Sequence, residues 1–264
     1  MTTIKLMVCP HDTAKNPENW YKLALYLTKN VGSSVIFKQS IDFPDFHQQL
    51  MNGELIYANP QDSVQLIKEH GYLPIARPSN LSDEIVFVAN KNFSNPKMTD
   101  LTGSTISSVG SMMVTKIGMI HLQKNDIRPA KINSKKSWMA VVKSIFRCEV
   151  DYAMIYKDFY DSLTEMSKSG LQKIGETKNG EIHHNVLISP ELKDSAQAVQ
   201  TCLLNMHKNN NYGQEVLTAL NIKTFIGVNS DEILKFENLH ISQKINDYGL
   251  KSINSSRSTL RWDS

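Results

Sequence analysis

The stretch Leu55-Ile-Tyr-Ala-Asn-Pro-Gln-Asp62 has the pattern of a short strand that stops abruptly and gives way to a helix. Its first four residues are apolar and of strand length, and Asn59-Pro60 closes the run, because the residue before a proline is held in extended backbone. The mixture of apolar and polar residues that follows predicts a helix from Asp62 to His70. This strand-to-helix transition is the unit from which the fold is predicted.

The same alternation precedes this unit. We predict strands at Ile4–Val8 and Ser34–Phe37, and helices at Trp20–Leu27 and Phe43–Leu50. Strands that alternate with helices over about 75 residues are typical of a parallel sheet covered by helices.

The alternation of strands and helices is interrupted at Glu84–Ala89, a β-prone run without helical periodicity, and resumes after it. Further strands are predicted at Thr105–Val109, Ala130–Asn133, Tyr152–Ile155 and Asn185–Ser189, and further helices at 110–123, 136–147, 196–207 and 213–220. We therefore expect an α/β protein of two lobes with a ligand cleft between them at the carboxyl ends of the strands. The expected boundaries are 1–89 plus 182–240 for lobe one, 90–181 for lobe two and 241–264 for a polar tail or linker.

Composition excludes several classes of protein. The 264 residues carry 29 basic and 26 acidic side chains, and only five of the basic ones are Arg, so a nucleic-acid partner is not expected. No apolar run approaches the length of a membrane span. The first 20 residues contain no secretory apolar segment, so the protein is expected to be cytoplasmic, or else periplasmic or membrane-anchored outside the cytoplasm after removal of a signal peptide.

Motifs for catalysis, metals and cofactors are weak. No glycine-rich phosphate loop and no nucleophile–base pattern occurs, so neither an enzyme nor a cofactor is expected. His183-His184 is the one pair that suggests a metal, but neighbouring residues of a strand point to opposite faces, so no metal site is predicted. His11-Asp12 follows the first strand, where it either orients a ligand or forms a turn and a helix cap. Asn59 and Gln61-Asp62 follow the third strand, where they either contact a ligand or lie at a helix start that Asp62 caps.

The order of segments resembles the phosphonate-binding, PhnD-like family of ABC-transporter solute-binding proteins, which has a two-lobed periplasmic-binding-protein fold. The stretches that carry the resemblance are Ile4–Pro10, Leu50–Pro60, Leu73–Pro78, Asp100–Gly103, Glu149–Ala153 and Ile188–Leu192. They follow the family's order from residue 4 to about residue 228.

The resemblance implies a ligand site whose chemistry has changed. The family holds phosphonate oxygens with a Ser-Thr-Ser run at a helix N-terminus, where this chain has Ser111-Met112-Met113. The positions of a ligand-binding His, an aromatic Tyr and a carboxylate that meets the ligand's amine are here Trp138, Phe43 and Tyr156. These replacements imply a ligand other than 2-aminoethylphosphonate.

Three interpretations of the cleft stay open: a changed organic ligand, such as a cation or a flat ring held by aromatic faces, a cleft that binds nothing small, and retained phosphate-type binding. The leading function is a monomeric solute-binding protein that closes by hinge motion on a small organic ligand and delivers it to an ABC permease. The alternatives are a ligand-sensing domain of the same fold with a membrane sensor partner and, less favoured, an enzyme on this fold.

Overall fold

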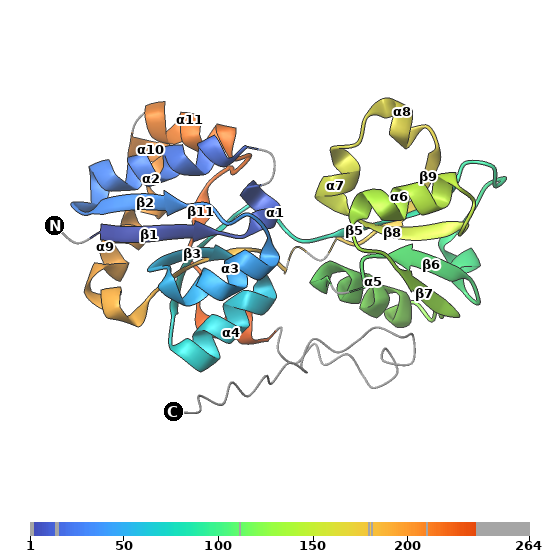
Figure 1. Cartoon of the computed structure of the whole chain (residues 1–264), viewed down its shortest axis with the longest axis horizontal. Coiled ribbons are helices and arrows are strands. Elements are labelled where there is room, and N and C mark those ends of the chain that lie inside the picture. The colour runs from blue at the N-terminus through green and yellow to red at the C-terminus, as the bar shows by residue number, and fades with distance from the viewer. Residues whose placement is uncertain are drawn as a thin grey trace, which may run out of the picture. The chain divides into compact units, whose positions relative to one another are not determined.

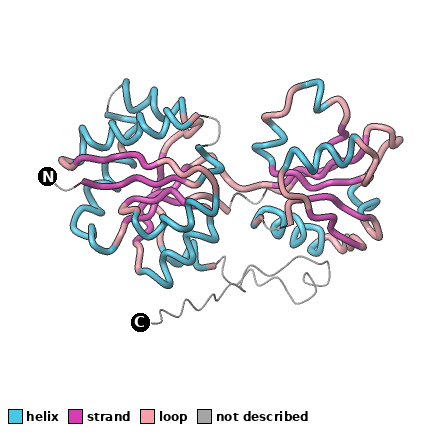
Figure 2. The backbone as a smooth tube through the Cα atoms, viewed as in Figure 1, coloured by secondary structure: helices cyan, strands magenta, loops and turns pink. Residues whose placement is uncertain are grey.

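The computed structural model describes residues 3–13, 16–110, 112–178, 180, 182–209 and 211–235, which form two compact units (Figures 1 and 2). The first unit contains 3–82 and returns at 180–235, and the second contains 83–178. Each unit has its own sheet and its own helices. The expected tail at 241–264 lies outside the described residues.

The first unit is built on a six-stranded sheet in the order β11-β4-β10-β3-β1-β2. Its strands are β1 (Thr3–Val8), β2 (Ser34–Lys38), β3 (Leu55–Ala58), β4 (Leu73–Pro78), β10 (Asn185–Ile188) and β11 (Phe225–Ile226). β1 runs parallel to both β2 and β3, whereas β10 is antiparallel to β3 and to β4. The amino end of β10 therefore lies beside the carboxyl end of β3, with Asn185 opposite Ala58.

Both faces of this sheet are buried, as the alternation of residues along β1 shows. Ile4, Leu6 and Val8 belong to one core cluster, and Met7 and Cys9 belong to another. The first cluster lies under the helices α2, α9 and α11, and the second lies under α3 and α4. Because successive side chains of a strand point to opposite faces, a sheet with helices on both sides needs apolar residues at every position.

The helices of the first unit follow their strands closely. Their bounds are α1 (Pro10–Thr13), α2 (Pro17–Val31), α3 (Phe43–Gln49), α4 (Pro60–His70), α9 (Lys193–Leu204), α10 (Met206–Asn209), α11 (Asn211–Ala219) and α12 (Ser230–Leu234), with short 3-10 turns η1 (Leu50–Asn52) and η3 (Pro190–Leu192). α2 and α4 both begin with proline and both end at a left-handed glycine, Gly32 and Gly71. Proline at a helix start and glycine just past its end are the expected helix boundaries.

The second unit has a five-stranded sheet in the order β7-β6-β8-β5-β9. Its elements are β5 (Ile85–Asn90), β6 (Thr105–Ser108), β7 (Lys131–Ser134), β8 (Tyr152–Tyr156) and β9 (Leu171–Glu176), with α5 (Met113–Lys124), α6 (Trp138–Phe146), α7 (Lys157–Asp161), α8 (Glu165–Lys168) and the 3-10 turn η2 (Met98–Leu101). β6, β7 and β8 are parallel, and β5 is antiparallel to β8 and β9.

Two neighbouring serines of β6 show how helices cover both faces of this sheet. The Ser107 hydroxyl accepts a hydrogen bond from Ser144 of α6 at 2.9 Å, and the Ser108 hydroxyl meets that of Thr115 of α5 at 2.8 Å. Since residues 107 and 108 point to opposite faces, α6 and α5 lie on opposite sides of the sheet.

The structure corrects the expected boundary at residue 89. The strand β5 was assigned to the end of lobe one, but it pairs with β8 and β9 inside the second sheet, and the chain leaves the first unit near residue 82. All six β5 residues are buried. The interruption of the strand–helix alternation at Glu84–Ala89 therefore marks an antiparallel strand of the second sheet.

Strands β4 and β9 were not predicted, for two different physical reasons. β4 contains Pro74 and Pro78, which cannot donate to the ladder, and its pairing with β10 shifts register between Val186 and Leu187. β9 is largely polar and lies at the sheet edge, where only Leu171 is buried.

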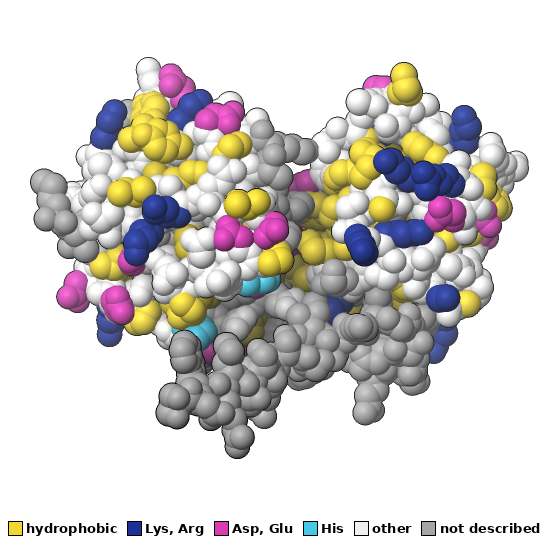
Figure 3. Space-filling model, in the orientation of Figure 1, with side chains coloured by type: hydrophobic (Ala, Val, Ile, Leu, Met, Phe, Trp, Pro, Cys, Tyr) yellow, Lys and Arg dark blue, Asp and Glu magenta, His cyan; other side chains and the backbone are white. Residues whose placement is uncertain are grey.

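The expected α/β fold class, with two lobes that each have a sheet flanked by helices, agrees with these two covered sheets, in which parallel and antiparallel pairs are mixed. Among the described residues, no helix combines the length and the apolar character needed to cross a bilayer. Figure 3 shows Lys and Arg side chains interspersed with acidic, apolar and uncharged polar ones on the face in view.

Candidate functional site

In the first unit, the predicted site residues follow the carboxyl ends of parallel strands. Asp12 lies in α1 just after β1, Phe43 begins α3 after β2, and Asn59 follows β3 directly. His11 also lies in α1, but its side chain and that of Phe43 are outside the described part of the structure. The topology thus collects these positions at one edge of the sheet.

Asn59 is the N-cap of α4. Its side-chain oxygen accepts hydrogen bonds from the backbone N–H groups of Gln61 and Asp62, both at 3.0 Å, and its Nδ2 donates to the Asp62 carboxylate at 2.6 Å. These contacts satisfy helix-end donors that would otherwise lack partners. Asn59 is therefore the residue that caps α4, whereas Asp62, the cap expected from the sequence, accepts a hydrogen bond from the Asn59 amide.

Asp62 also holds His47, which lies on α3. The His47 Nε2 is 3.0 Å from Asp62 Oδ1, and this hydrogen bond raises the pKa of His47 above its ordinary value of 6.5, against an opposing effect of burial. The His47 side chain is half-exposed and that of Asp62 is buried. The pair joins α3 to α4 on one face of the sheet.

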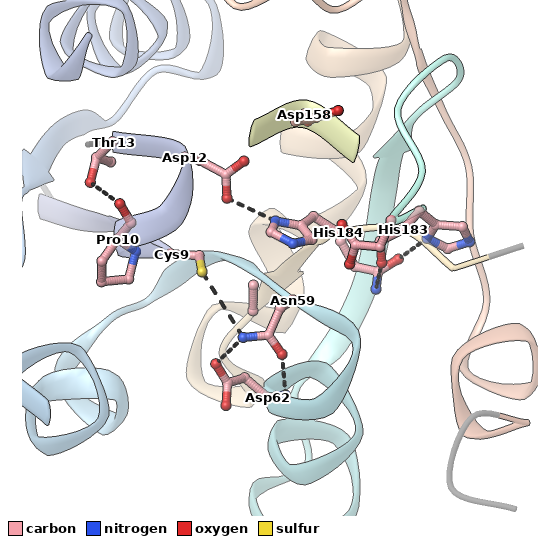
Figure 4. Close-up of polar contacts among 12 residues, drawn as sticks. Cys9, Pro10, Asp12, Thr13, Asn59, Asp62, Asp158, His183 and His184 are labelled. Atoms are coloured by element: carbon pink, nitrogen blue, oxygen red, sulfur yellow. Dashed lines mark hydrogen bonds and ion pairs between the residues drawn. The ribbon is translucent and has the colours of Figure 1, made fainter. Parts of the chain in front are cut away.

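A second polar cluster, formed by Cys9, Asp12 and His184, lies at the same sheet edge (Figure 4). His184 precedes β10, whose antiparallel course brings it to the carboxyl end of β3. Its Nδ1 is 2.8 Å from Asp12 Oδ2, and its ring centroid is 5.4 Å from that of Tyr57. One potential donor atom from each of the three residues lies within 4.8 Å of the others.

The neighbouring histidine has a different environment. His183 Nδ1 is 2.8 Å from the side-chain oxygen of Asn185, and the Asn185 amide donates to the Ser63 hydroxyl at 3.2 Å. His183 and His184 thus take part in separate networks, as expected for neighbours in extended backbone.

In the second unit, the predicted residues again follow the carboxyl ends of three parallel strands. Met112 and Met113 come after β6, Trp138 comes after β7, and Tyr156 ends β8. Met112 occupies the N-cap position of α5, where its side chain makes no capping hydrogen bond, and Ser111 lies outside the described residues. A thioether at this position offers no donor to an anion.

Trp138 is largely buried, with 9% of its surface exposed. It is the first residue of α6, after the Ser137 cap, and its ring centroid lies 6.2 Å from that of Tyr156. The expectation that Trp138 lines the cleft beside Ser111 and Phe43 stays untested, because neither partner side chain is described. The described contact is with its own unit.

The Tyr156 hydroxyl lies between two carboxylates. It contacts Asp83 Oδ1 at 3.0 Å and Asp158 Oδ2 at 3.2 Å, and both Tyr156 and Asp83 are buried. The aromatic pair Trp138–Tyr156 is therefore bordered by two carboxyl groups.

Sequence reasoning missed Asp83, Asp158 and His184 as members of these edges. Asp83 and His184 lie just before antiparallel strands, so neither follows a strand end in the sequence. The signal that was available is strand direction: residues before an antiparallel strand join the carboxyl edge of its parallel neighbours.

A separate hollow lies at the opposite edge of the first sheet, next to the amino end of β3. It has a volume of about 310 Å³ and is lined by polar groups, including Lys5, Glu54 and Tyr72. Glu54 already accepts from the Lys5 backbone N–H at 2.7 Å, and the Tyr72 hydroxyl donates to the Gly53 carbonyl at 2.7 Å. None of the predicted site residues contributes to this hollow.

Comparison with protein families identifies the chain. The model of the periplasmic phosphonate substrate-binding proteins of ABC transporters matches residues 6–233, which is most of the sequence. The chain belongs to this phosphonate-binding family. Its members are transport proteins that carry substrate in the periplasm, so the predicted resemblance and the solute-binding class are confirmed. No curated protein sequence matches the chain.

Solved structures agree with this fold. The phosphonate-binding protein PhnD1 of Prochlorococcus marinus, in complex with methylphosphonate, is 16% identical with a TM-score of 0.72, covering 93% of this chain and 98% of that one. XAC2383 of Xanthomonas citri, bound to chloride, is 14% identical with a TM-score of 0.69, covering 93% and 99%. A binding protein of an ABC phosphonate transporter from Pseudomonas aeruginosa is 14% identical with a TM-score of 0.66, covering 95% and 89%. At these identities the likeness shows the fold.

Proposed function

We propose that this member of the phosphonate-binding family is the periplasmic receptor of an ABC uptake system, and that it closes by hinge motion on a small, positively charged organic ligand. The partner is a membrane permease that accepts the closed form. Within the described residues, the chain leaves the first unit near residue 82 and returns to it near residue 180, and these crossings form the hinge. Rotation at such crossings leaves both sheets undisturbed.

The observation that carries the ligand class is the environment of Tyr156. Its hydroxyl contacts the carboxylates of Asp83 and Asp158, and its ring lies beside Trp138. A cation near an aromatic face gains about 0.5–2 kcal/mol per contact, and a nearby carboxylate adds to that attraction. An amine or quaternary ammonium group therefore fits this edge of the second sheet.

The N-terminus of α5 argues against an oxyanion. Met112 and Met113 supply no hydroxyl there, so only Ser111 of the three positions keeps a hydroxyl beside the backbone N–H groups. Each hydrogen bond lost to a charged group costs about 1.5–3 kcal/mol. We propose that this loss has moved the specificity away from 2-aminoethylphosphonate.

A thermal-shift screen tests the proposal. The compounds are phosphate, methylphosphonate, 2-aminoethylphosphonate, small quaternary amines and aromatic heterocycles. A true ligand at 100 times its Kd adds about 2.7 kcal/mol of stability, which raises the melting temperature measurably. We expect amines to shift the transition and expect the shift to disappear in Asp158→Asn.

The variant Asp151→Asn serves as the matched control, because Asp151 is an exposed carboxylate just before β8. It should keep the full response to the amine. Stabilisation by phosphate or a phosphonate without any response to amines would contradict the proposed ligand class. A screen in which no small molecule stabilises the protein would contradict a receptor role.

A further inference from the structure

We propose that the cluster of Cys9, Asp12 and His184 binds a zinc ion. The three residues offer one sulfur, one carboxylate oxygen and one imidazole nitrogen, all within 4.8 Å of one another. The site lies wholly within the first unit. It is independent of the ligand class proposed above, which rests on residues of the second unit.

The backbone fixes the positions of all three residues. The Cys9 N–H donates to the Tyr57 carbonyl at 2.9 Å, and the Asp12 N–H donates to the Cys9 carbonyl at 2.9 Å, which closes one turn of α1 over the end of β1. His184 is held by the pairing of β10 with β3 immediately after it. The donors therefore converge from β1, α1 and β10 without depending on a mobile loop.

Burial separates this cluster from a surface group of acidic residues. Cys9 is 1% exposed, the His184 side chain is 8% exposed and the Asp12 side chain is 20% exposed. Asp12 is the most exposed of the three side chains, so solvent reaches the cluster from its side. Three protein ligands with one open position are a common zinc arrangement.

The set of donors selects the class of metal. Calcium and magnesium prefer sites made of oxygen atoms, whereas thiolate with imidazole favours zinc or cobalt. Tetrahedral bonds of about 2.0–2.3 Å place neighbouring ligand atoms about 3.3–3.8 Å apart. His184 Nδ1 and Asp12 Oδ2 are already 2.8 Å apart, and small side-chain movements bring the donors to those separations.

Groups around the cluster can orient its members. The Asn59 amide lies 4.0 Å from the Cys9 sulfur, where it can support the thiolate form. The Trp20 Nε1–H donates to the Asp12 carbonyl at 3.1 Å and ties α1 to α2. Tyr57 packs against the His184 ring. Such outer contacts commonly tune metal sites.

Binding has a defined proton balance. Zinc replaces the proton of the Cys9 thiol, which passes to solvent, and binds the neutral imidazole of His184 and the ionised carboxylate of Asp12. No oxidation or reduction is involved. His183 does not contribute, so the objection that neighbouring histidines cannot share one ion is consistent with this site.

Calorimetric titration of the reduced, metal-free chain with zinc tests the proposal. We expect one equivalent per chain with a Kd tighter than about 10 µM. Cys9→Ser, Asp12→Asn and His184→Gln should each weaken binding by at least about tenfold. Asp12→Asn is the variant most certain to fold, because its side chain is partly exposed.

Cobalt supplies an independent readout. Cobalt bound to the wild type should show a near-ultraviolet thiolate-to-cobalt charge-transfer band that Cys9→Ser lacks. The controls are Cys202→Ser, which removes another buried thiol, and His47→Gln, which removes another carboxylate-paired histidine; both should bind like the wild type.

A Kd weaker than about 10 µM would overturn the zinc site, as would affinity that Asp12→Asn leaves unchanged or a cobalt spectrum without the thiolate band. Those results would mean that the cluster is an Asp–His ion pair beside a buried thiol. The amine screen would be unaffected, since its deciding residues lie in the second unit.

Discussion

At the scale of single residues, Trp138 is predicted from its sequence position to face a ligand, which stays a prediction, and its ring is largely buried and lies beside Tyr156. We therefore expect Trp138→Ala to destabilise the protein by about 3–5 kcal/mol, since it leaves a large cavity. Urea denaturation measures this. The control is Met139→Ala on the exposed side of the same helix, which should change stability by no more than about 0.5 kcal/mol. A loss below about 1 kcal/mol for Trp138→Ala would contradict the buried placement.

The pair His47–Asp62 predicts a pH dependence whose sign is fixed. The pKa of His47 is raised above 6.5 in the folded state, chiefly by its hydrogen bond to Asp62. The pair's contribution to the free energy of unfolding is therefore fully present below the unfolded pKa and disappears as pH rises through the folded pKa. We expect the destabilisation caused by His47→Gln to be larger at about pH 5.5 than at about pH 8.

Urea denaturation of the wild type and His47→Gln at both pH values measures that difference. His207→Gln is the control for general histidine titration, because His207 Nδ1 contacts the Thr224 hydroxyl and not a carboxylate. A loss of stability in His47→Gln that is constant with pH, or larger at the higher pH, would disprove the stabilising contact between protonated His47 and Asp62.

At the scale of elements, substitution of Asn59 tests whether this residue caps a helix or contacts a ligand. Its oxygen accepts two backbone hydrogen bonds at the start of α4, so Asn59→Ala should cost about 1 kcal/mol, within a range of about 0.5–2 kcal/mol. Asn16→Ala is a matched control, since Asn16 precedes α2 without a side-chain capping bond. Thermal unfolding should show a loss for Asn59→Ala alone, and equal effects of the two variants would refute the capping role.

The elements that could be predicted from the sequence are those whose burial requires a recognisable run or repeat of apolar residues. Strand β3 is apolar throughout, and β1 and β5 are largely apolar apart from Thr3, Lys5 and Asn90, so their runs were recognised. β4 was missed because its two prolines are untypical of a strand, and β9 was missed because its position at the sheet edge allows polar residues.

The candidate site was predicted only in part, and strand direction is the physical reason. Positions that follow parallel strands, such as Asn59 and Trp138, stand out in the sequence. Asp83 and His184 reach the same edges through the antiparallel strands β5 and β10, and pairing direction is not written in local periodicity.

At the scale of the whole molecule, the chain belongs to the phosphonate-binding family, and we propose that it differs from its relatives at the positions that hold the phosphonate. The helix α5 begins with Met112 and Met113, and Tyr156 stands between two carboxylates. We propose that a family fold for small-molecule binding here carries side chains that favour a cation over an oxyanion.

Isothermal titration calorimetry with 2-aminoethylphosphonate, methylphosphonate and phosphate tests this change of specificity most directly. Two lost hydrogen bonds to a charged group remove about two to four decades of affinity, so each compound should bind no tighter than about 1 mM. Micromolar binding of any of the three would contradict the proposed change of ligand.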